Sequence, residues 1–298
     1  MRNSCMARYL RTRAGRGKEE TGRRANLEDW IALIRILTLN LRLEMAMDGI
    51  HSFSNRKEGL IRCLEKEKPD VMGFQEMTPE MLLAMREGLT DYSFAGERNR
   101  ASGKTEYTAI GYRRETLVLE KAETFWLSYT PDVQGSRFPL QSPDPRTCTW
   151  AVFRHVHTGM RFRYFNTHLD HLSPWARAKG LRVIFQRMAE IQAGEWLPLF
   201  FGGDFNFTPS SVLYKACLLQ RMGEETLVDL TRGLTTTFHW FGKLRGPFKL
   251  DYVFCDSNTA QSMVDVRILR YNDEGGFLSD HDAVSMVWSA GASLPQTQ

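Results

Sequence analysis

The sequence contains no long hydrophobic run and little cysteine, and both absences exclude classes of protein. No apolar stretch approaches the roughly 18 to 20 residues that a membrane-spanning helix needs. The N-terminus lacks the continuous apolar core of a secretory signal, so a cytoplasmic location is expected. The five cysteines among 298 residues form no CxxC pair. They are therefore predicted to be reduced, packed thiols, with neither a disulfide framework nor a zinc site.

The main body of the chain also lacks an excess of positive charge. A net charge of +4 arises from 39 Lys and Arg against 35 Asp and Glu. Residues 1–24 hold eight of the basic residues and two glutamates, so the other 274 residues carry a charge of −2. Non-specific nucleic-acid binding needs several phosphate-neutralising side chains on one face, and the composition of the body indicates no such face. Residues 1–29 are predicted to form a disordered basic tail; a nucleic-acid arm, a solvated segment and an incorrectly assigned start are the alternatives.

What the sequence does contain is an alternation of strand and helix patterns from residue 30 to residue 292, which predicts one domain of the α/β class. Helices are predicted at 56–66, 78–89 and 174–193. Strands are predicted at 34–41, 71–74, 107–112, 117–127, 149–156, 161–168, 197–201, 250–254, 263–269 and 283–287. The connection 128–146 contains four prolines, and loops of this length are usually functional or mobile.

The segment FFGGDFNFTPSS, residues 200–211, is the most informative stretch. An apolar strand turns on two glycines and presents Asp204 and Asn206, which strand periodicity predicts on one face. Pro209 is predicted at the first position of a following helix, after a Thr or Ser cap. A carboxylate and an amide are expensive to bury beside an apolar strand, which indicates a functional strand end.

Other predicted strand ends carry polar side chains of the same kind. They are Asn40, Glu76, His168, Asp170, His171, Asp251, Asp280 and His281. Taken singly, each has an ordinary interpretation as a turn residue, a helix cap or a packed histidine. Asp251, however, lies inside the apolar segment KLDYVF, where an unpaired charge is costly, and His281 is its natural partner. Carboxylates and amides without a cysteine pair or an HExxH motif favour Mg²⁺ or Mn²⁺, and such a site suits hydrolysis of a phosphate ester.

Six short motifs follow one another in a recognisable order: Asn40, Gln75-Glu76, NTHLDH, GDFN, LDYVF and SDH. In this order they resemble the endonuclease/exonuclease/phosphatase superfamily, the deoxyribonuclease I-like metal-dependent phosphohydrolases. The resemblance spans residues 40–281 and implies a four-layer sandwich, in which two mixed β-sheets pack face to face with helices on both outer sides. It also implies one active site at the strand ends.

For the metal, the resemblance implies that Glu76, helped by Asn40, holds Mg²⁺, for which Mn²⁺ can substitute. Asp280 is placed beside the metal or behind the histidine. Arg42 departs from the pattern, because abasic-site endonucleases of the superfamily carry an aspartate at this position. One metal bound on Glu76 is therefore expected, not two.

For the reaction, the resemblance implies that Asp204 orients or deprotonates the attacking water. Asn206 and His168 are expected to contact the phosphate. His281, paired with Asp251, is expected to stabilise the negative charge of the transition state.

The segments ETFWLSYTPDVQGS and PRTCTWA resemble a bacterial branch of the superfamily with poorly assigned substrates. In that branch Arg146 and Glu106 face the site, and together with His171 and Asp170 they are the substrate-binding candidates. A surface arginine and a strand-edge glutamate are the alternatives. Several aromatic residues are candidates to line a pocket for a ring-bearing substrate, with core packing as the alternative: Trp126, Trp175, Phe238, His239 and Trp240.

Two enzyme hypotheses and one non-enzymatic hypothesis follow. The first is a Mg²⁺-dependent hydrolase of a small or medium organic phosphate, such as a sugar phosphate, a lipid or inositol headgroup, or a nucleotide. The alternative is an endonuclease or exonuclease acting on DNA or RNA with help from the basic tail. A binding module that kept only the fold is disfavoured, because Glu76, Asp204, Asp251 and His281 are all present. The protein is expected to be a monomer.

Overall fold

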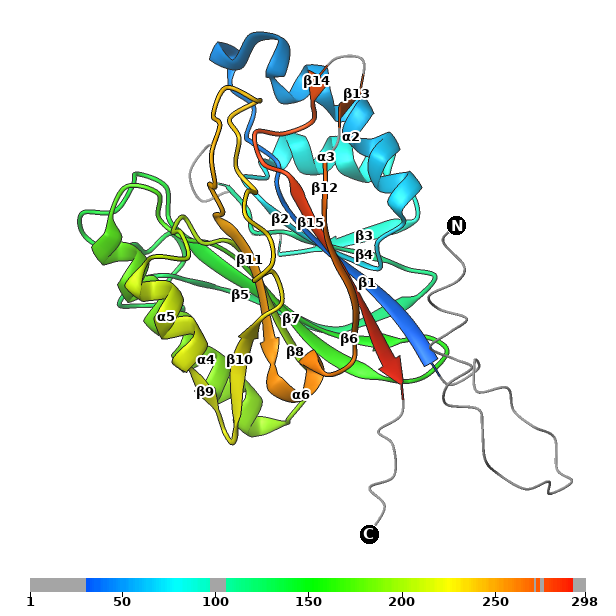
Figure 1. Ribbon diagram of the computed structural model, residues 1–298, viewed down its shortest axis with the longest axis vertical. Coiled ribbons are helices and arrows are strands. Elements are labelled where there is room, and N and C mark those ends of the chain that lie inside the picture. Colours follow the sequence, from blue (N-terminus) through cyan, green and yellow to red (C-terminus); the bar gives the residue numbers. More distant parts are fainter. Residues whose placement is uncertain (1–30, 97–105, 271, 274–275, 292–298) are drawn as a thin grey trace, which may run out of the picture.

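The structure is a computed structural model that describes residues 31–96, 106–270, 272–273 and 276–291 (Figure 1). The predicted tail, residues 1–29, lies outside the described residues. The helices are η2 (Ala46–His51), α2 (Phe53–Glu67), α3 (Pro79–Gly88), α4 (Pro174–Gly194), α5 (Val212–Leu219) and α6 (Ser257–Ala260). The strands up to the middle of the chain are β1 (Ile31–Asn40), β2 (Val71–Gln75), β3 (Tyr92–Ala95), β4 (Ile110–Arg113), β5 (Leu117–Trp126), β6 (Thr147–His155), β7 (Arg161–His168) and β8 (Leu199–Asp204). The later strands are β9 (Arg221–Met222), β10 (Glu225–Asp229), β11 (Asp251–Asp256), β12 (Met263–Leu269), β13 (Asn272–Asp273), β14 (Gly276–Phe277) and β15 (Ala283–Gly291).

Two mixed sheets form the centre of the fold. The six-stranded sheet has the order β12-β15-β1-β2-β4-β3, and the seven-stranded sheet has the order β5-β6-β7-β8-β11-β10-β9. Within the first sheet β1 pairs with β2 in parallel and with β15 antiparallel, which joins the two ends of the described domain. Within the second sheet β7 and β8 are parallel, and β8 and β11 are antiparallel.

Three apolar cores separate four layers, as the predicted sandwich requires. One core lies between the sheets, a second between the six-stranded sheet and helices α2 and α3, and a third between the seven-stranded sheet and helices α4 and α5 (Figure 1). Successive side chains of a strand point to opposite faces. Phe200 therefore enters the core between the sheets and Phe201 the core under α4, and both are fully buried because the sheet is covered on both faces.

One predicted helix start was wrong. Pro209 does not occupy the first turn of α5; the helix begins at Val212, and Ser211 is its cap, with its side chain accepting a hydrogen bond from the Leu213 amide. The predicted helix starts at residues 78 and 174 agree with the structure to within one residue. Thr78 and Ser173 cap α3 and α4, and Pro79 and Pro174 follow as the first helical residues.

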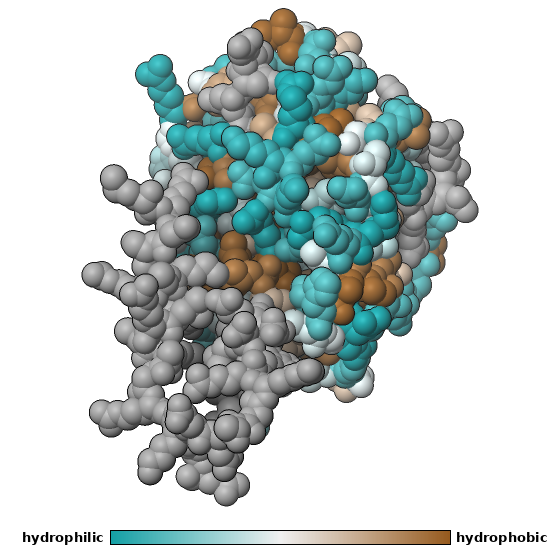
Figure 2. Space-filling model, turned by 90° about the vertical axis from the view of Figure 1, so that its right-hand side faces the viewer, coloured by the Kyte–Doolittle hydropathy of each residue, from teal (hydrophilic) through white to brown (hydrophobic). Residues whose placement is uncertain are grey.

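Three of the described cysteines are buried thiols outside any disulfide, as predicted. Cys148, Cys217 and Cys255 are buried in the apolar cores. Within the described ranges, every helix is too short or too polar to traverse a lipid bilayer. Figure 2 shows mostly hydrophilic side chains over the coloured part of one face, with smaller hydrophobic patches between them.

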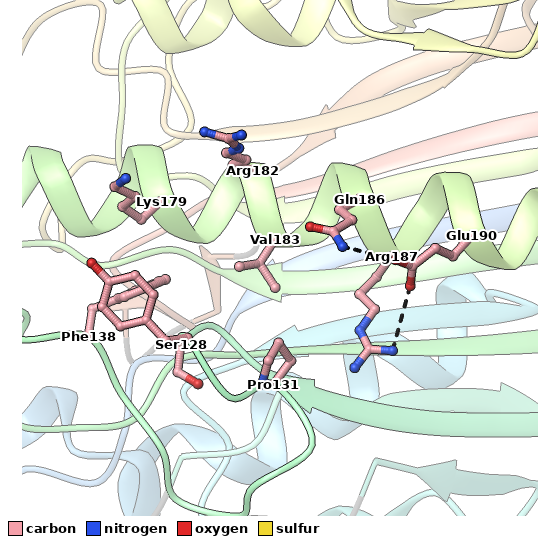
Figure 3. A pocket seen from close by; sticks show the side chains of 10 residues that line it. Ser128, Pro131, Phe138, Lys179, Arg182, Val183, Gln186, Arg187 and Glu190 are labelled. Carbon is pink, nitrogen blue, oxygen red and sulfur yellow. Dashed lines mark hydrogen bonds and ion pairs between the residues drawn. The ribbon is translucent and has the colours of Figure 1, made fainter.

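The long connection 128–146 packs onto α4 and leaves a hollow of about 510 Å³ between them (Figure 3). Phe138 is buried there, and its ring lies edge-on to both Tyr129 and Trp175. The basic side chains along the hollow belong to α4, and of these Arg187 is paired with Asp132. None of the predicted site residues lines this hollow.

Candidate active site

Strand register places three of the candidate side chains in one row of the seven-stranded sheet. His168 at the end of β7 is the register partner of Asp204 at the end of β8, and Asp204 is the partner of Asp251 at the start of β11. All three residues are buried. Partners in adjacent strands lie about 5 Å apart, so residues distant in sequence meet at one edge of the sheet.

The six-stranded sheet contributes a second group to the same edge. Asn40 ends β1, and Glu76 follows β2. The Asn40 Nδ2 atom donates to Glu76 Oε1 at 3.0 Å and to Asp204 Oδ2 at 3.0 Å. One amide nitrogen thus joins carboxylates from the two sheets, which places Glu76 and Asp204 in a single site.

Left-handed backbone turns occur at several of these strand ends. Glu76 has φ 58°, Asn206 has φ 50° and Arg42 has φ 54°, a region that costs free energy in residues with a Cβ and that clusters at functional sites. The prediction that Asn206 continues the strand face of Asp204 was therefore wrong. Instead, a turn folds Asn206 back, so that its backbone amide donates to Asp204 Oδ1 at 2.9 Å and its Nδ2 donates to the Leu169 carbonyl.

Gly203, just before Asp204, is required by close packing. A Cβ atom at this position would lie 1.9 Å from the Thr167 carbonyl oxygen, and the φ of Gly203 is 143°. Any side chain here would push β8 away from β7 and displace Asp204.

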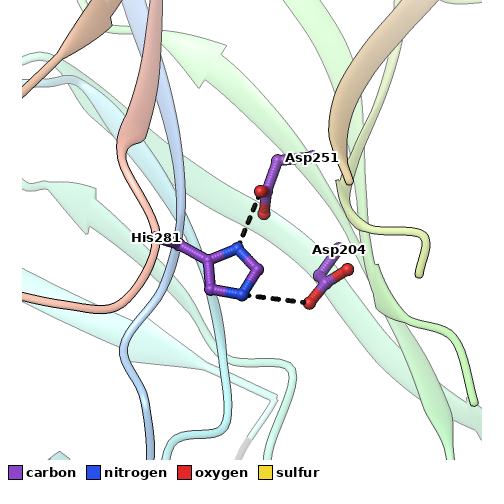
Figure 4. A group of neighbouring side chains, drawn as sticks. All are labelled: Asp204, Asp251 and His281. Carbon is purple, nitrogen blue, oxygen red and sulfur yellow. Dashed lines mark hydrogen bonds and ion pairs between the residues drawn. The ribbon is translucent and has the colours of Figure 1, made fainter. Parts of the chain in front are cut away.

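His281 forms the predicted pair with Asp251 (Figure 4). Its Nδ1 lies 2.8 Å from Asp251 Oδ2, and its Nε2 lies 3.7 Å from Asp204 Oδ2. Despite burial, which lowers it, the pKa of His281 rises to about 10 because Asp251, Asp204 and Asp280 surround the ring. His281 is therefore an imidazolium at neutral pH, with one N–H held by Asp251 and the other directed toward Asp204.

His168 also approaches Asp204 but has a different partner. Its Nε2 lies 3.6 Å from Asp204 Oδ2, and its Nδ1 lies 2.9 Å from Arg146 Nη1. Arg146 is buried, and it also donates to Glu106 at 3.0 Å and to His171 Nδ1 at 2.8 Å. Burial and the Arg146 charge lower the pKa of His168 to about 4, so this ring is neutral at pH 7.

Asp204 has both histidines as neighbours. Burial and the neighbouring Asp251 carboxylate raise the pKa of Asp204, while His281 and His168 act in the opposite direction. A carboxylate whose pKa is raised toward the working pH is a better proton acceptor than an exposed aspartate. The arrangement therefore provides a base, a charged acid and a neutral donor around one point.

Asp170, one of the predicted site residues, holds a loop. It accepts hydrogen bonds from the backbone of Ser142, Leu172 and Ser173, which fixes the start of α4 to the connection 128–146. The carboxylate of Asp280 lies 3.9 Å from Arg42 Nε. The pKa of Arg42 is raised, chiefly by the hydrogen bond to Asp48 and further by the charges of Asp280 and Glu76.

The aromatic candidates separate into three environments. Trp126 is buried in the core, as its packing alternative predicts. Trp175 and Trp240 are each exposed by more than two fifths. Phe238 packs against the His281 ring at 4.8 Å between centroids, and His239 lies behind the site, 3.5 Å from Asp282.

Carboxylate oxygens are the ligands that a hard divalent cation prefers. Glu76 and Asp280 both lie near Arg42, and the charge of each raises the pKa of that arginine. Asn40 has its amide nitrogen toward the carboxylates, while its Oδ1 accepts from the Arg42 amide; it orients Glu76 here. The group of Asp204, Asp251 and His281 is also compact enough for an ion, and the Nδ1 atom of His281 faces Asp251.

Sequence reasoning missed the residues that hold the strand ends together. Arg56 is buried, and its guanidinium donates to the carbonyls of Leu41, Arg42 and Leu278. This clamps the Asn40 segment to the segment that carries His281. Nothing in the helical pattern around Arg56 distinguishes it from a surface arginine, so no local signal was available. Thr237 similarly accepts from the amide of Asp251 through its hydroxyl.

Comparisons with known proteins define the class of protein. Residues 37–281 match the Endonuclease/Exonuclease/phosphatase family, so the chain belongs to this family. Members of the family are phosphoester hydrolases, and metal binding is typical of them.

Among solved structures, the chain is similar to an endonuclease/exonuclease/phosphatase from Bacteroides vulgatus. The two are 28% identical with a TM-score of 0.74, covering 86% of this chain and 98% of the other. It is also similar to a mannosyl-6-phosphatase from Bacteroides thetaiotaomicron, at 26% identity and a TM-score of 0.71, covering 85% and 98% of the two chains. A curated relative, an uncharacterized protein of Acanthamoeba polyphaga mimivirus, is 23% identical over 74% of this chain and 87% of its own length.

Proposed function

We propose that this phosphoester hydrolase is Mg²⁺-dependent and that Asp204 orients water for in-line attack on a small or medium organic phosphate. The observation that carries the proposal is the central position of Asp204, with Asn40 at 3.0 Å, His168 at 3.6 Å and His281 at 3.7 Å. Asp204 is thus a base with hydrogen-bond donors close to it. This arrangement suits a reaction in which negative charge builds up on the oxygens of the attacked phosphoryl group.

Each side chain then has one task. Asp204 accepts the proton of the attacking water. The Nε2–H groups of His168 and His281 donate to phosphoryl oxygens, and the imidazolium of His281 offsets the charge that develops on them. Asp251 keeps that imidazolium charged and oriented. Asn206 helps to hold Asp204 in place, because its backbone amide donates to Asp204 Oδ1.

The metal is proposed to be held by Glu76 and Asp280, with Asn40 orienting Glu76. When bound there, Mg²⁺ or Mn²⁺ supplies Lewis-acid polarisation of the phosphoryl group. Glu76 is only partly buried, so a cation has access from solvent. Its two oxygens already accept from Asn40 Nδ2 and from the Leu43 amide at 3.0 Å each, which fixes the direction of the carboxylate.

A small substrate is favoured over nucleic acid by charge and by similarity. Outside residues 1–24 the chain carries −2, and the arginines nearest the site are engaged: Arg42 with Asp48, Arg56 with backbone carbonyls, and Arg146 with Glu106. The similar mannosyl-6-phosphatase is named for a sugar phosphate. We therefore propose a sugar phosphate or a related organic phosphate as the substrate class.

A screen of phosphate esters tests the proposal. The purified protein is assayed with Mg²⁺ and with Mn²⁺ against sugar phosphates, inositol phosphates, nucleotides and oligonucleotides, with Asp204→Ala as the blank. Release of phosphate from a small ester by the wild type and not by the blank supports the proposal. Activity confined to oligonucleotides supports the nuclease alternative instead.

Replacement of Glu76 with alanine is expected to raise the Mg²⁺ concentration needed for half-maximal activity, by about 10- to 100-fold, because the carboxylate is a proposed ligand. Activity is measured across a Mg²⁺ titration, with the exposed helix residue Glu87→Ala as the matched control. A Glu76→Ala variant with the wild-type Mg²⁺ dependence would remove Glu76 from the metal site.

Deletion of residues 1–24 is expected to leave kcat/KM for a small phosphate ester unchanged. Those residues carry a charge of +6, and a nuclease that uses them to neutralise phosphates would lose affinity and much of its salt dependence. The measurement is kcat/KM for the ester and for an oligonucleotide, each at two salt concentrations. A loss restricted to the oligonucleotide would show that the basic segment serves nucleic acid.

A further inference from the structure

Two histidines approach the same oxygen of one carboxylate and have partners of opposite charge. His281 contacts the Asp251 carboxylate through Nδ1, and His168 contacts the Arg146 guanidinium through Nδ1. Their Nε2 atoms lie 3.7 Å and 3.6 Å from the same oxygen of Asp204. The partner of each Nδ1 thus decides what each Nε2 presents to the site.

The contact between Arg146 and His168 favours one assignment of protons. A guanidinium has five N–H donors and no acceptor, and Arg146 Nη1 lies 2.9 Å from His168 Nδ1. Nδ1 must therefore accept, which leaves the ring proton on Nε2. Glu106 lies 3.3 Å from the same nitrogen but 3.0 Å from Arg146 Nη1, so it serves as the acceptor for the arginine.

We propose that Arg146 is a positioning residue that holds His168 as the neutral tautomer with its proton on Nε2, ready to donate to the substrate phosphoryl group. Arg146 is buried, and its contacts with Glu106, His168 and His171 occupy its terminal nitrogens. It acts through His168 instead of binding substrate. The proposal rests on the proposed function only in naming a phosphoryl group as the acceptor of the Nε2 proton. The tautomer of His168 does not depend on the proposed function.

The neutral state matters because of Asp204. A second imidazolium beside this carboxylate would pair with it and weaken it as a base. A neutral Nε2–H donor binds a phosphoryl oxygen without that cost. Arg146 thus makes His168 a neutral donor, and Asp251 makes His281 a charged one. In identical surroundings the two rings would not differ in protonation state.

The tautomer is measured directly by long-range ¹H–¹⁵N NMR on protein labelled at histidine, in buffer containing Mg²⁺ and no substrate. The His168 signals are assigned by their loss in His168→Gln. The expected result is an unprotonated Nδ1 and a protonated Nε2 in the wild type. A protonated Nδ1 would overturn the proposal and make Glu106 the partner.

Two variants of Arg146 connect the tautomer to activity. Arg146→Met keeps most of the side-chain volume and removes every donor; we expect a mixed tautomer and a loss in kcat/KM of about 10- to 100-fold. Arg146→Lys keeps a charged donor group at this position and is expected to recover part of the Nε2–H tautomer and part of kcat/KM. Arg137→Met, an exposed arginine of the same connection that donates to the Pro143 carbonyl, is the matched control and is expected to change neither.

An Arg146→Met variant that retains the wild-type tautomer and kcat/KM would overturn the proposal. If Arg146→Met does not fold, Glu106→Gln is used to test the proposal instead, because this variant leaves the contact between Arg146 and His168 in place. The Nε2–H tautomer is expected to persist in Glu106→Gln, and a shift of the proton to Nδ1 would contradict the proposal. Failure to find a hydrolysed ester would affect the proposed function and leave the tautomer measurement intact.

Discussion

Replacing Asp204 with asparagine or alanine is expected to lower kcat by on the order of 10²- to 10⁴-fold, the usual contribution of a general base. Asp204 is the carboxylate that Asn40, His168 and His281 all face, so its replacement removes the proposed proton acceptor from the centre of the site. The measurement is the steady-state rate on the best ester from the screen, at saturating Mg²⁺. A variant that keeps kcat within a few-fold of the wild type would require another base.

A measurement of folding stability distinguishes the loss of the base from misfolding of the variant. Because burial and Asp251 raise the pKa of Asp204 above its unfolded value, the ionised carboxylate opposes folding at neutral pH, and this cost falls as the pH drops through the raised pKa. The isosteric Asp204→Asn variant is therefore expected to keep or raise the Tm while activity is lost. A large fall in Tm would instead attribute the lost activity to the fold.

Replacing His281 with glutamine is expected to lower kcat by on the order of 10²- to 10³-fold, as loss of a group that stabilises transition-state charge does. His281 is the imidazolium that points its second N–H toward Asp204, and Asp251 keeps it charged. His157→Gln, an exposed histidine in the turn between β6 and β7, is the matched control and should be neutral. The assay is the same steady-state rate, with kcat and KM determined separately.

A double-mutant cycle tests whether Asp251 acts through His281. Residues that act as a unit show strongly non-additive effects, so the double variant His281→Gln, Asp251→Asn is expected to be little worse than His281→Gln alone. Full additivity of the two losses would show that Asp251 has a separate role in the reaction.

Much of the site followed from residue chemistry alone. The pairing of Asp251 with His281 was predicted from the cost of a charge in an apolar strand, and the two atoms lie 2.8 Å apart. The strands that carry Asn40, Glu76, His168 and Asp204 were predicted from apolar runs, and each of these residues stands at or directly after a strand end. The local sequence predicts these strands because a buried strand can be recognised from a short apolar segment.

Other features depended on contacts that no local pattern contains. Pro209 obeys the rule for a helix start, but the chain first turns and caps α5 at Ser211. Asn206 shares a strand spacing with Asp204, yet the left-handed turn directs it elsewhere. Arg56 looked like a surface helix residue and instead holds three backbone carbonyls of the site.

The sequence by itself determined which chemical groups are present: oxygen ligands, two histidines and a buried acid, in the order of one family of phosphoester hydrolases. Only the tertiary structure decided how those groups differ from one another. Asp204 becomes the central base because strand register sets His168 and Asp251 on either side of it. The two histidines take opposite protonation states because Asp251 faces one and Arg146 the other. Proton affinity depends on the charges within a few ångströms, and those neighbours come from strands far apart in the chain.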